Sequence, residues 1–202
     1  MRRALLHLKK VDPVLCGIIK QVGPYRIRYA EPDFETLARS IVFQQLSGHS
    51  ARAIFGRVKD LVSSNGRMTP HGVLARTDAE LRGAGLSRRK AEYLRDLAEK
   101  TQAGDIDCVR LSALSDDDVI RQLTAVRGVG VWTAQMFLLF ALRRPDVLAA
   151  GDLGIRSAVR RAYRLRTLPR PAKIEQLARR WHPYCSVACW YLWRSADDVL
   201  LA

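Results

Sequence analysis

The stretch that decides the fold is Leu-Thr-Ala-Val-Arg-Gly-Val-Gly-Val-Trp-Thr-Ala, residues 123–134. Its two glycines, Gly128 and Gly130, permit a tight turn with positive φ and a close approach of the backbone to another surface. The pattern before them, from Ser115, is typical of a capped helix. The segment after them, Gly130 to Leu142, is apolar on nearly every side, as in a buried helix. We therefore predict two helices joined by a short hairpin.

The hairpin has a chemical consequence as well as a structural one. Backbone N–H groups at the start of the second helix, together with the helix dipole, form an anion site that a DNA phosphate would fit. A plain structural turn is the competing interpretation, because Gly-x-Gly between helices is common. A similar sequence at residues 81–85, Leu-Arg-Gly-Ala-Gly, is explained equally well as a helix–turn–helix corner that needs glycine.

Outward from the hairpin, the sequence predicts an all-α fold of short helices and short loops. Asp33 caps a helix that reaches the Gln44-Gln45 pair, and Thr77 with Glu80 forms a capping box. Residues 63–66 are typical of a turn. Residues 1–32 stay unassigned, since prolines and Gly23 interrupt their pattern. Further helices are expected at 50–62, from Thr69-Pro70, and at 88–100, 115–125, 152–163, 171–181 and 183–196.

The amino-acid composition limits the classes of partner that the chain is expected to bind. Among 202 residues, 34 Lys and Arg against 20 Asp and Glu leave a net charge of +14. That excess favours a polyanion, either nucleic acid or an anionic membrane surface. No stretch approaches 18 apolar residues, and the first ten residues lack the pattern of a secretory signal. The scattered cysteines indicate a reducing, intracellular compartment: Cys16, Cys108, Cys185 and Cys189.

Four further stretches, taken with the hairpin, carry a resemblance. They are Ser-Ile-Val-Phe-Gln-Gln-Leu-Ser (40–47), Gly-Leu-Ser-Arg-Arg-Lys-Ala (85–91), Asp-Val-Leu-Ala-Ala-Gly-Asp-Leu-Gly-Ile-Arg (146–156) and the tryptophan-rich segment 181–193. In this order they resemble the helix–hairpin–helix (HhH-GPD) DNA glycosylase superfamily, and within it the 3-methyladenine DNA glycosylase II group of alkylation-repair enzymes. The resemblance implies two helical subdomains flanking a cleft, with residues 1–32 packing on a glycosylase core of residues 33–202.

The resemblance implies that Asp152 is the catalytic residue. Cleavage of an N-glycosidic bond develops positive charge on the sugar, and an ionised carboxylate near C1′ stabilises that charge and orients or deprotonates water. A role as N-cap of the following helix is equally sound physically, and both roles can hold together. Gly151 stands where other members carry a second acidic residue.

Trp132 indicates the subtype. In superfamily members that also cut the DNA backbone, this position is a lysine that forms a Schiff base. Tryptophan here implies a monofunctional enzyme that flips out and excises alkylated purines of the 3-methyladenine and 7-methylguanine type and leaves an abasic site. A cationic alkylpurine is a good leaving group, which suits a site with one carboxylate.

By the same resemblance, Trp132 and Trp193 line the base pocket, with Met136 and Leu153 where relatives carry tyrosines. Electron-rich rings attract a cationic base, although an unplaced tryptophan is more often a core residue. Gln45 or Leu46 is the wedge that fills the gap left by the flipped base. Leu46 could equally belong to the core.

Contacts with the DNA backbone are expected around the hairpin and after Asp152, where basic residues from Arg156 to Lys173 have no acidic neighbour among them. A merely solvated face is the competing explanation of that run. The predicted contacts are Gly128, Gly130, Val131, Thr133, Arg127, Arg156 and Arg160.

No cofactor is expected. Two cysteines near the end of the chain do not match the four that hold an iron–sulfur cluster in some relatives. His182 with Cys185 and Cys189 lacks a fourth metal ligand. By resemblance, a monovalent cation could bind backbone carbonyls at Thr124, Val126 and Val129.

The expected partner is double-stranded DNA with alkylated bases, bound by a monomer in the cytoplasm, associated with the nucleoid if the chain is bacterial. Two alternatives stay open: a non-catalytic helix–hairpin–helix DNA-binding module, and a glycosylase for deaminated or oxidised bases. A membrane-surface protein fits less well, because the segment 130–142 has no charged face.

Overall fold

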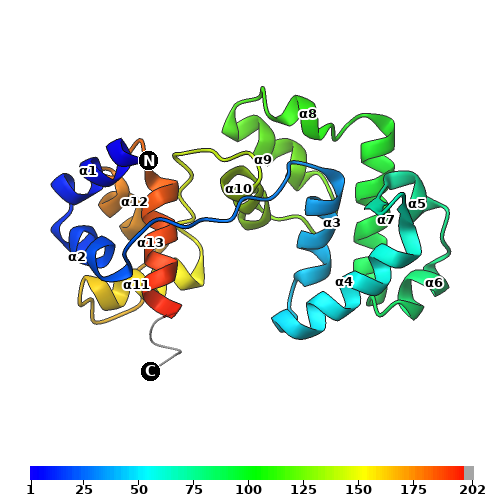
Figure 1. Ribbon diagram of the computed structural model, residues 1–202, viewed down its shortest axis with the longest axis horizontal. Coiled ribbons are helices and arrows are strands. Elements are labelled where there is room, and N and C mark those ends of the chain that lie inside the picture. Colours follow the sequence, from blue (N-terminus) through cyan, green and yellow to red (C-terminus); the bar gives the residue numbers. More distant parts are fainter. Residues whose placement is uncertain (198–202) are drawn as a thin grey trace. The chain divides into compact units, whose positions relative to one another are not determined.

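The computed structural model describes residues 1–197, and these form two compact units. The first unit contains residues 1–29 and the chain from Arg143 onward, and the second contains residues 30–142. The chain therefore passes between the units twice, near residues 29 and 142. Figure 1 labels the helices of both units.

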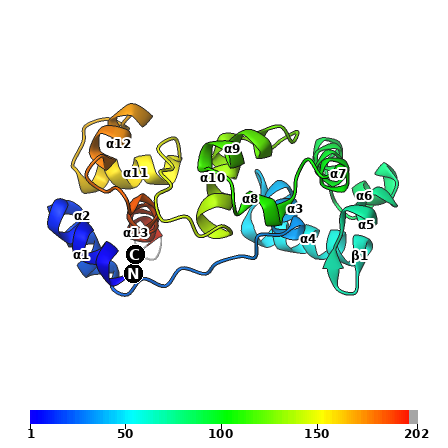
Figure 2. The ribbon, with the colours of Figure 1, turned by 90° about the horizontal axis from the view of Figure 1, so that it is seen from above.

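The first unit is built from five helices within the described residues: α1 (Arg2–Val11), α2 (Pro13–Val22), α11 (Leu153–Ala162), α12 (Pro171–Ala178) and α13 (Cys185–Asp197). The N-terminal helix α2 packs on the C-terminal helix α13, and α11 packs on α13 as well (Figures 1 and 2). The first unit therefore combines helices from both ends of the described chain. Leu8, Leu15 and Tyr191 are fully buried in this core.

Residues 1–22, which the sequence pattern left unassigned, form two helices because of one Asp-Pro pair. Asp12 caps α2 by accepting hydrogen bonds from the Val14 and Leu15 N–H groups, and Pro13 occupies the first helical position. Proline at that position loses no hydrogen bond and has the φ that a helix needs. The same signal at Thr69-Pro70 predicted a helix start correctly, so the signal at Asp12 was readable and was missed.

The second unit holds the remaining helices: α3 (Phe34–Phe43), α4 (Gly48–Val62), α5 (Pro70–Leu74), α6 (Asp78–Gly83), α7 (Arg88–Ala103), α8 (Cys108–Leu111), α9 (Asp116–Thr124) and α10 (Val131–Phe140). Within this unit α3 contacts α4, α7 and α10 (Figure 1). Its inward residues Leu37, Ala38 and Ile41 are at most 1% exposed. The central position of α3 fixes the loop that follows it.

One departure from an entirely helical fold is a two-residue ladder. Strands β1 (Ser63–Ser64) and β2 (Arg67–Met68) pair antiparallel around Asn65 and Gly66, both of which have positive φ. Asn-Gly is the preferred pair for such a tight hairpin. The turn predicted at residues 63–66 is therefore confirmed, and so is the mainly helical class of the fold.

The predicted helix caps are confirmed with small shifts of the boundaries. Asp33 accepts from Thr36 N–H, and Thr77 with Glu80 forms a reciprocal capping box. The prediction that the helix after the hairpin is buried all round is wrong at its first turn: Val131 and Trp132 are 54% and 50% exposed. Apolar composition at the end of a helix does not by itself indicate burial.

The similarity of residues 81–85 to the hairpin does not extend to backbone geometry. In the hairpin the positive φ falls on Gly128, the first glycine, whereas in the other copy it falls on Gly85, the second. Gly83 is the last residue of α6, while Gly130 directly caps α10. The first copy is thus an ordinary helix corner.

Candidate functional site

The hairpin between α9 and α10 is packed so closely that it requires glycine. A Cβ atom built on Gly128 would lie 2.1 Å from Cδ2 of Tyr93, and the φ of Gly128 is +77°. Both the space and the left-handed conformation exclude other residues. The backbone at Gly128 consequently rests on the face of a ring from α7.

Asp96, also on α7, holds the next part of the hairpin. Its Oδ2 accepts a 2.8 Å hydrogen bond from the backbone N–H of Arg127, and its Oδ1 lies 2.7 Å from the Lys100 ammonium. Burial alone would raise the pKa of the Asp96 carboxyl, but the hydrogen bonds from Lys100 and Arg127 outweigh it and leave the pKa below its ordinary value. Asp96 is therefore an ionised, structural partner of the hairpin.

The first turn of α10 faces outward with its backbone donors. Gly130 is the N-cap and offers no side chain, and the helical ladder begins with Ala134 N–H donating to Gly130. The N–H groups of Val131, Trp132 and Thr133 precede that ladder, as do the first donors of any helix. The Thr133 side chain is buried, so this residue can contact a phosphate only through its backbone.

Asp152 stands at the start of α11, in the first unit. It is the N-cap, and its Oδ1 accepts a 2.8 Å hydrogen bond from Ile155 N–H. The cap hydrogen bond holds the carboxylate at the N-terminal, positive end of the dipole of a ten-residue helix. The side chain is partly exposed. A helix cap and a chemically accessible carboxylate are thus combined in one residue.

Trp193, expected as a wall of the base pocket, contacts the carboxylate directly. Its indole N–H donates to Oδ1 of Asp152 at 2.8 Å, from helix α13. Gly154 permits this approach, since a Cβ there would lie 3.0 Å from Asp152 Oδ1 and 3.2 Å from the Trp193 ring. The sequence missed this role, although Gly154, two residues after Asp152, was a signal for it. Leu153, predicted for the pocket, lies beside this pair and is 64% exposed.

A largely apolar cavity lies in the second unit, between α3 and α10. Its volume is about 450 Å³, within the range of small-molecule sites. Trp132 and Met136, the two residues of this unit expected in the base pocket, both line it. The sequence missed Phe140 on the same helix, and it missed Ser40 and Phe43, which line the opposite side from α3. The spacing 132, 136 and 140 on one helix face was the available signal.

The predicted wedge residues occupy the loop between α3 and α4. Gln45 is exposed with a φ of +56°, and Leu46 is 38% exposed. A core position for Leu46 is therefore wrong. Gln44 points the other way and donates from Nε2 to the carbonyl of Gly128 at 2.8 Å.

The basic residues that follow Asp152 differ in what their side chains contact. Arg156 donates from Nε to the carbonyl of Pro169, so it holds the loop between α11 and α12 as well as adding charge. Arg160 is exposed. Farther on, a hollow of about 770 Å³ has four cationic lining residues and no acidic one among those described. These cations are Arg166, Arg170, Lys173 and Arg179.

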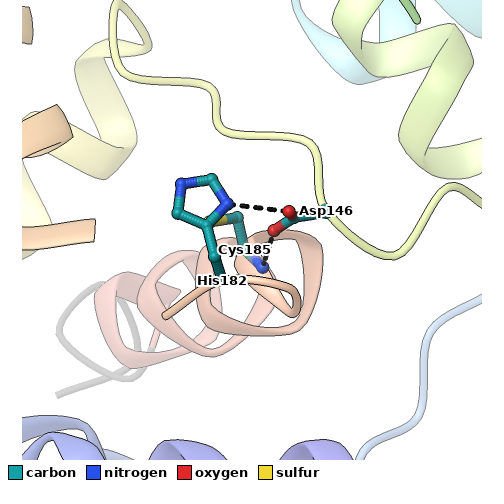
Figure 3. Close-up of side chains that lie close together, drawn as sticks. All are labelled: Asp146, His182 and Cys185. Atoms are coloured by element: carbon teal, nitrogen blue, oxygen red, sulfur yellow. Dashed lines mark hydrogen bonds and ion pairs between the residues drawn. The ribbon is translucent and has the colours of Figure 1, made fainter. Parts of the chain in front are cut away.

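The structure groups other possible metal ligands together than the sequence suggested. Cys189 points to the carbonyl of Val147, and Asp146 takes its place beside His182 and Cys185 (Figure 3). Asp146 Oδ2 lies 2.7 Å from His182 Nδ1, and its Oδ1 accepts the Cys185 N–H at 3.0 Å. Burial raises the pKa of the Cys185 thiol. These contacts join the segment before Asp152 to the start of α13.

Of the carbonyls expected to bind a monovalent cation, that of Thr124 belongs to the last residue of α9, and those of Val126 and Val129 lie in the turn. The carbonyl of Val126 accepts the Val129 N–H at 3.1 Å.

Among the described residues, no helix is long and apolar enough to span a bilayer.

The part of the chain that carries these features is similar to a known protein family. Residues 38–183 match the family model described as HhH-GPD superfamily base excision DNA repair protein. The match covers the loop between α3 and α4 (residues 44–47, the predicted wedge loop), the hairpin and Asp152. The chain belongs to this superfamily.

Within the superfamily, the chain belongs to the 3-methyladenine DNA glycosylase group. It is 35% identical over 202 residues to DNA-3-methyladenine glycosylase 1 of Schizosaccharomyces pombe, covering 97% of this chain and 88% of the relative. A solved structure of a 3-methyladenine DNA glycosylase of that organism, in complex with abasic DNA, superposes with a TM-score of 0.86 at 35% identity and covers 96% and 97% of the two chains. A DNA-3-methyladenine glycosidase from Bacillus halodurans gives 0.85 at 36% identity and covers 96% and 89%.

Proposed function

We propose that this protein is a monofunctional DNA-3-methyladenine glycosylase, an N-glycosyl hydrolase that excises alkylated purines and leaves an abasic site for base excision repair. The observation that carries the proposal is the Asp152 carboxylate, held by the N–H groups of Ile155 and Trp193 at the start of α11. Fixed geometry and an ionised state are what stabilisation of a sugar cation requires.

The proposed reaction follows from the charge that develops on the sugar and the charge that the alkylated base already carries. As the bond between C1′ and the base lengthens, the sugar becomes cationic and the base leaves with the bonding electrons. Asp152 stabilises that cation, and the attacking water transfers a proton to the Asp152 carboxylate as the new C–O bond forms. A base alkylated at N3 or N7 is cationic before cleavage and leaves as a neutral purine. The reaction therefore needs no strong general acid.

The flipped base, which is still cationic before cleavage, binds against Trp132 and Met136 in the apolar cavity of the second unit. A cation over an aromatic face gains about 1–2 kcal/mol when both are desolvated. With tryptophan at position 132 there is no lysine to form a Schiff base, and release of the base ends the reaction. Strands should stay intact until alkali is added.

Duplex DNA binds through the outward N–H groups of Gly130, Val131 and Thr133 and through basic side chains, with Arg127 and Arg160 both exposed. Phosphate contacts release counterions, so affinity should fall steeply as salt is added. An affinity independent of salt would contradict this mode of binding. The enzyme acts as a monomer in the compartment that holds the DNA, the cytoplasm or nucleoid in a bacterium.

The deciding experiment measures base release from duplexes carrying 3-methyladenine, 7-methylguanine or hypoxanthine. Wild-type protein should release the first two, and Asp152→Asn should lower the single-turnover rate about 10³-fold or more while duplex binding survives. Equal rates in both proteins would remove Asp152 from the mechanism. Release of hypoxanthine alone would favour a glycosylase for deaminated bases, and no release from any lesion would favour a DNA-binding module.

A further inference from the structure

The loop that carries Gln45 and Leu46 is fastened to the hairpin by a side chain that the catalytic argument does not use. Gln44 ends α3, and its amide Nε2 donates to the carbonyl of Gly128 at 2.8 Å. Gln45 follows with positive φ, so the chain turns sharply outward directly after this contact. The wedge candidates are therefore one and two residues from a fixed point on the hairpin.

A second fastening comes from Lys90. Its ammonium donates to the carbonyl of Gln44 at 2.6 Å and to that of Val42 at 2.7 Å. These are carbonyls of the last turn of α3, which helix geometry leaves without partners inside the helix. A cation at this end also complements the helix dipole. Lys90 thus fixes the point at which the loop leaves α3.

The same face of α7 supports both the loop and the hairpin. Lys90, Tyr93 and Asp96 recur every third residue, and they hold the Gln44 carbonyl, the Gly128 backbone and the Arg127 N–H. Residues three and six apart lie on one side of a helix. The loop and the hairpin are therefore mounted on one base, and Gln44 joins them to each other.

We propose that Gln44 is a positioning residue for base extrusion: it holds the wedge loop in register with the hairpin that grips the DNA backbone. This inference rests on the proposed function, because extrusion matters only if a base is flipped. A wedge must enter the stack at the nucleotide whose phosphates the hairpin holds. A loop free to move loses conformational entropy each time it inserts, whereas a fastened loop is ordered beforehand. Gln44 acts through Gln45 and Leu46, without contact with the reacting atoms.

The test replaces the amide while keeping the length of the side chain. Gln44→Met removes the donor to Gly128, and Gln102→Met makes the same change on the exposed side of α7 as the matched control. Extrusion is followed by the fluorescence of 2-aminopurine placed next to a 7-methylguanine in duplex DNA. Single-turnover release is measured on the same duplex and on one where the lesion is unpaired in a bulge.

With Gln44→Met we expect extrusion and release from the paired duplex to fall about five- to tenfold, the effect of one lost hydrogen bond. Release from the bulged lesion and affinity for undamaged duplex should stay within about twofold of wild type, because neither needs the wedge. Gln102→Met should match wild type throughout. Thermal unfolding of both variants establishes that they are folded.

Three outcomes overturn the inference. Unchanged extrusion in folded Gln44→Met would show that the contact with Gly128 positions nothing. An equal loss on paired and bulged lesions, or a loss of affinity for undamaged duplex, would assign Gln44 to the hairpin or the fold instead. Lys90→Met gives an independent check, since loosening the same loop should reproduce the selective loss on paired lesions. If wild-type protein releases no base from either duplex, the proposed function itself fails.

Discussion

Two aspartates of the first unit, Asp12 and Asp152, are built almost alike and differ in one respect. Each caps a helix through its carboxylate, and each accepts a hydrogen bond of 2.8 Å from a tryptophan indole, Trp181 for Asp12 and Trp193 for Asp152. Asp12 is 1% exposed, whereas Asp152 is partly exposed.

Both carboxylates accept hydrogen bonds from backbone and side-chain donors. At Asp12, Val14 and Leu15 N–H groups donate to Oδ1, while Trp181 and the Tyr163 hydroxyl donate to Oδ2. Burial and the neighbouring carboxylate raise the pKa of Tyr163, which keeps its hydroxyl a donor. At Asp152, the donors Ile155 and Trp193 converge on Oδ1. The buried Asp12 carboxylate holds helices of the first unit together, whereas the partly exposed Asp152 carboxylate is accessible from solvent.

The largest expected effect separates the two residues completely. Asp152→Asn should abolish base release but change the free energy of unfolding by no more than about 1 kcal/mol. Asp12→Asn should lower that free energy by about 3 kcal/mol, because an amide nitrogen would face buried donors. Denaturant unfolding and single-turnover release measure both quantities on each variant. If Asp12→Asn, assayed while folded, also loses catalysis, burial is not what distinguishes the pair.

The two tryptophan donors, Trp181 and Trp193, offer a second pair of variants, with smaller expected effects than the aspartate variants. Trp193→Phe removes a donor from Asp152 and should slow the chemical step about tenfold, with duplex affinity unchanged. Trp181→Phe leaves buried Asp12 short of a donor and should lower the free energy of unfolding by about 2 kcal/mol. A Trp193→Phe enzyme that loses affinity for the lesion but keeps its rate at saturation would return Trp193 to the base pocket.

Asp96 extends the comparison to the second unit, with the smallest effect. Its pKa is depressed in the folded protein, so its contribution to stability is present above the ordinary aspartate pKa of about 3.9. That contribution is lost as the pH falls through the lower, folded value. Asp96→Asn should therefore cost about 1 kcal/mol near neutrality and flatten the acid limb of stability. An acid limb identical to that of the wild type would exclude Asp96 as a partner of Arg127.

Local signals predicted most of the helices correctly. Capping residues such as Asp33, Thr77 and Ser115 act within three positions of themselves, so they can be recognised without knowledge of the fold. The Gly-Val-Gly hairpin was predictable for the same reason, whereas the assignment of Gln45 as a wedge candidate came from the family resemblance. Residues 1–22 were missed through an unread Asp-Pro signal, and no tertiary contact was needed to find it.

The sequence by itself determined which chemical groups are present: a helical chain with excess positive charge, a glycine hairpin, and Asp152 at the start of a helix. Only the tertiary structure decided which residues contact these groups. Asp12 and Asp152 carry the same cap signal, and no local rule says which one is buried. Trp193 lies 41 residues from Asp152 and Gln44 lies 84 from Gly128. Such contacts depend on how α13, α3 and α10 pack, because packing is set by many residues at once.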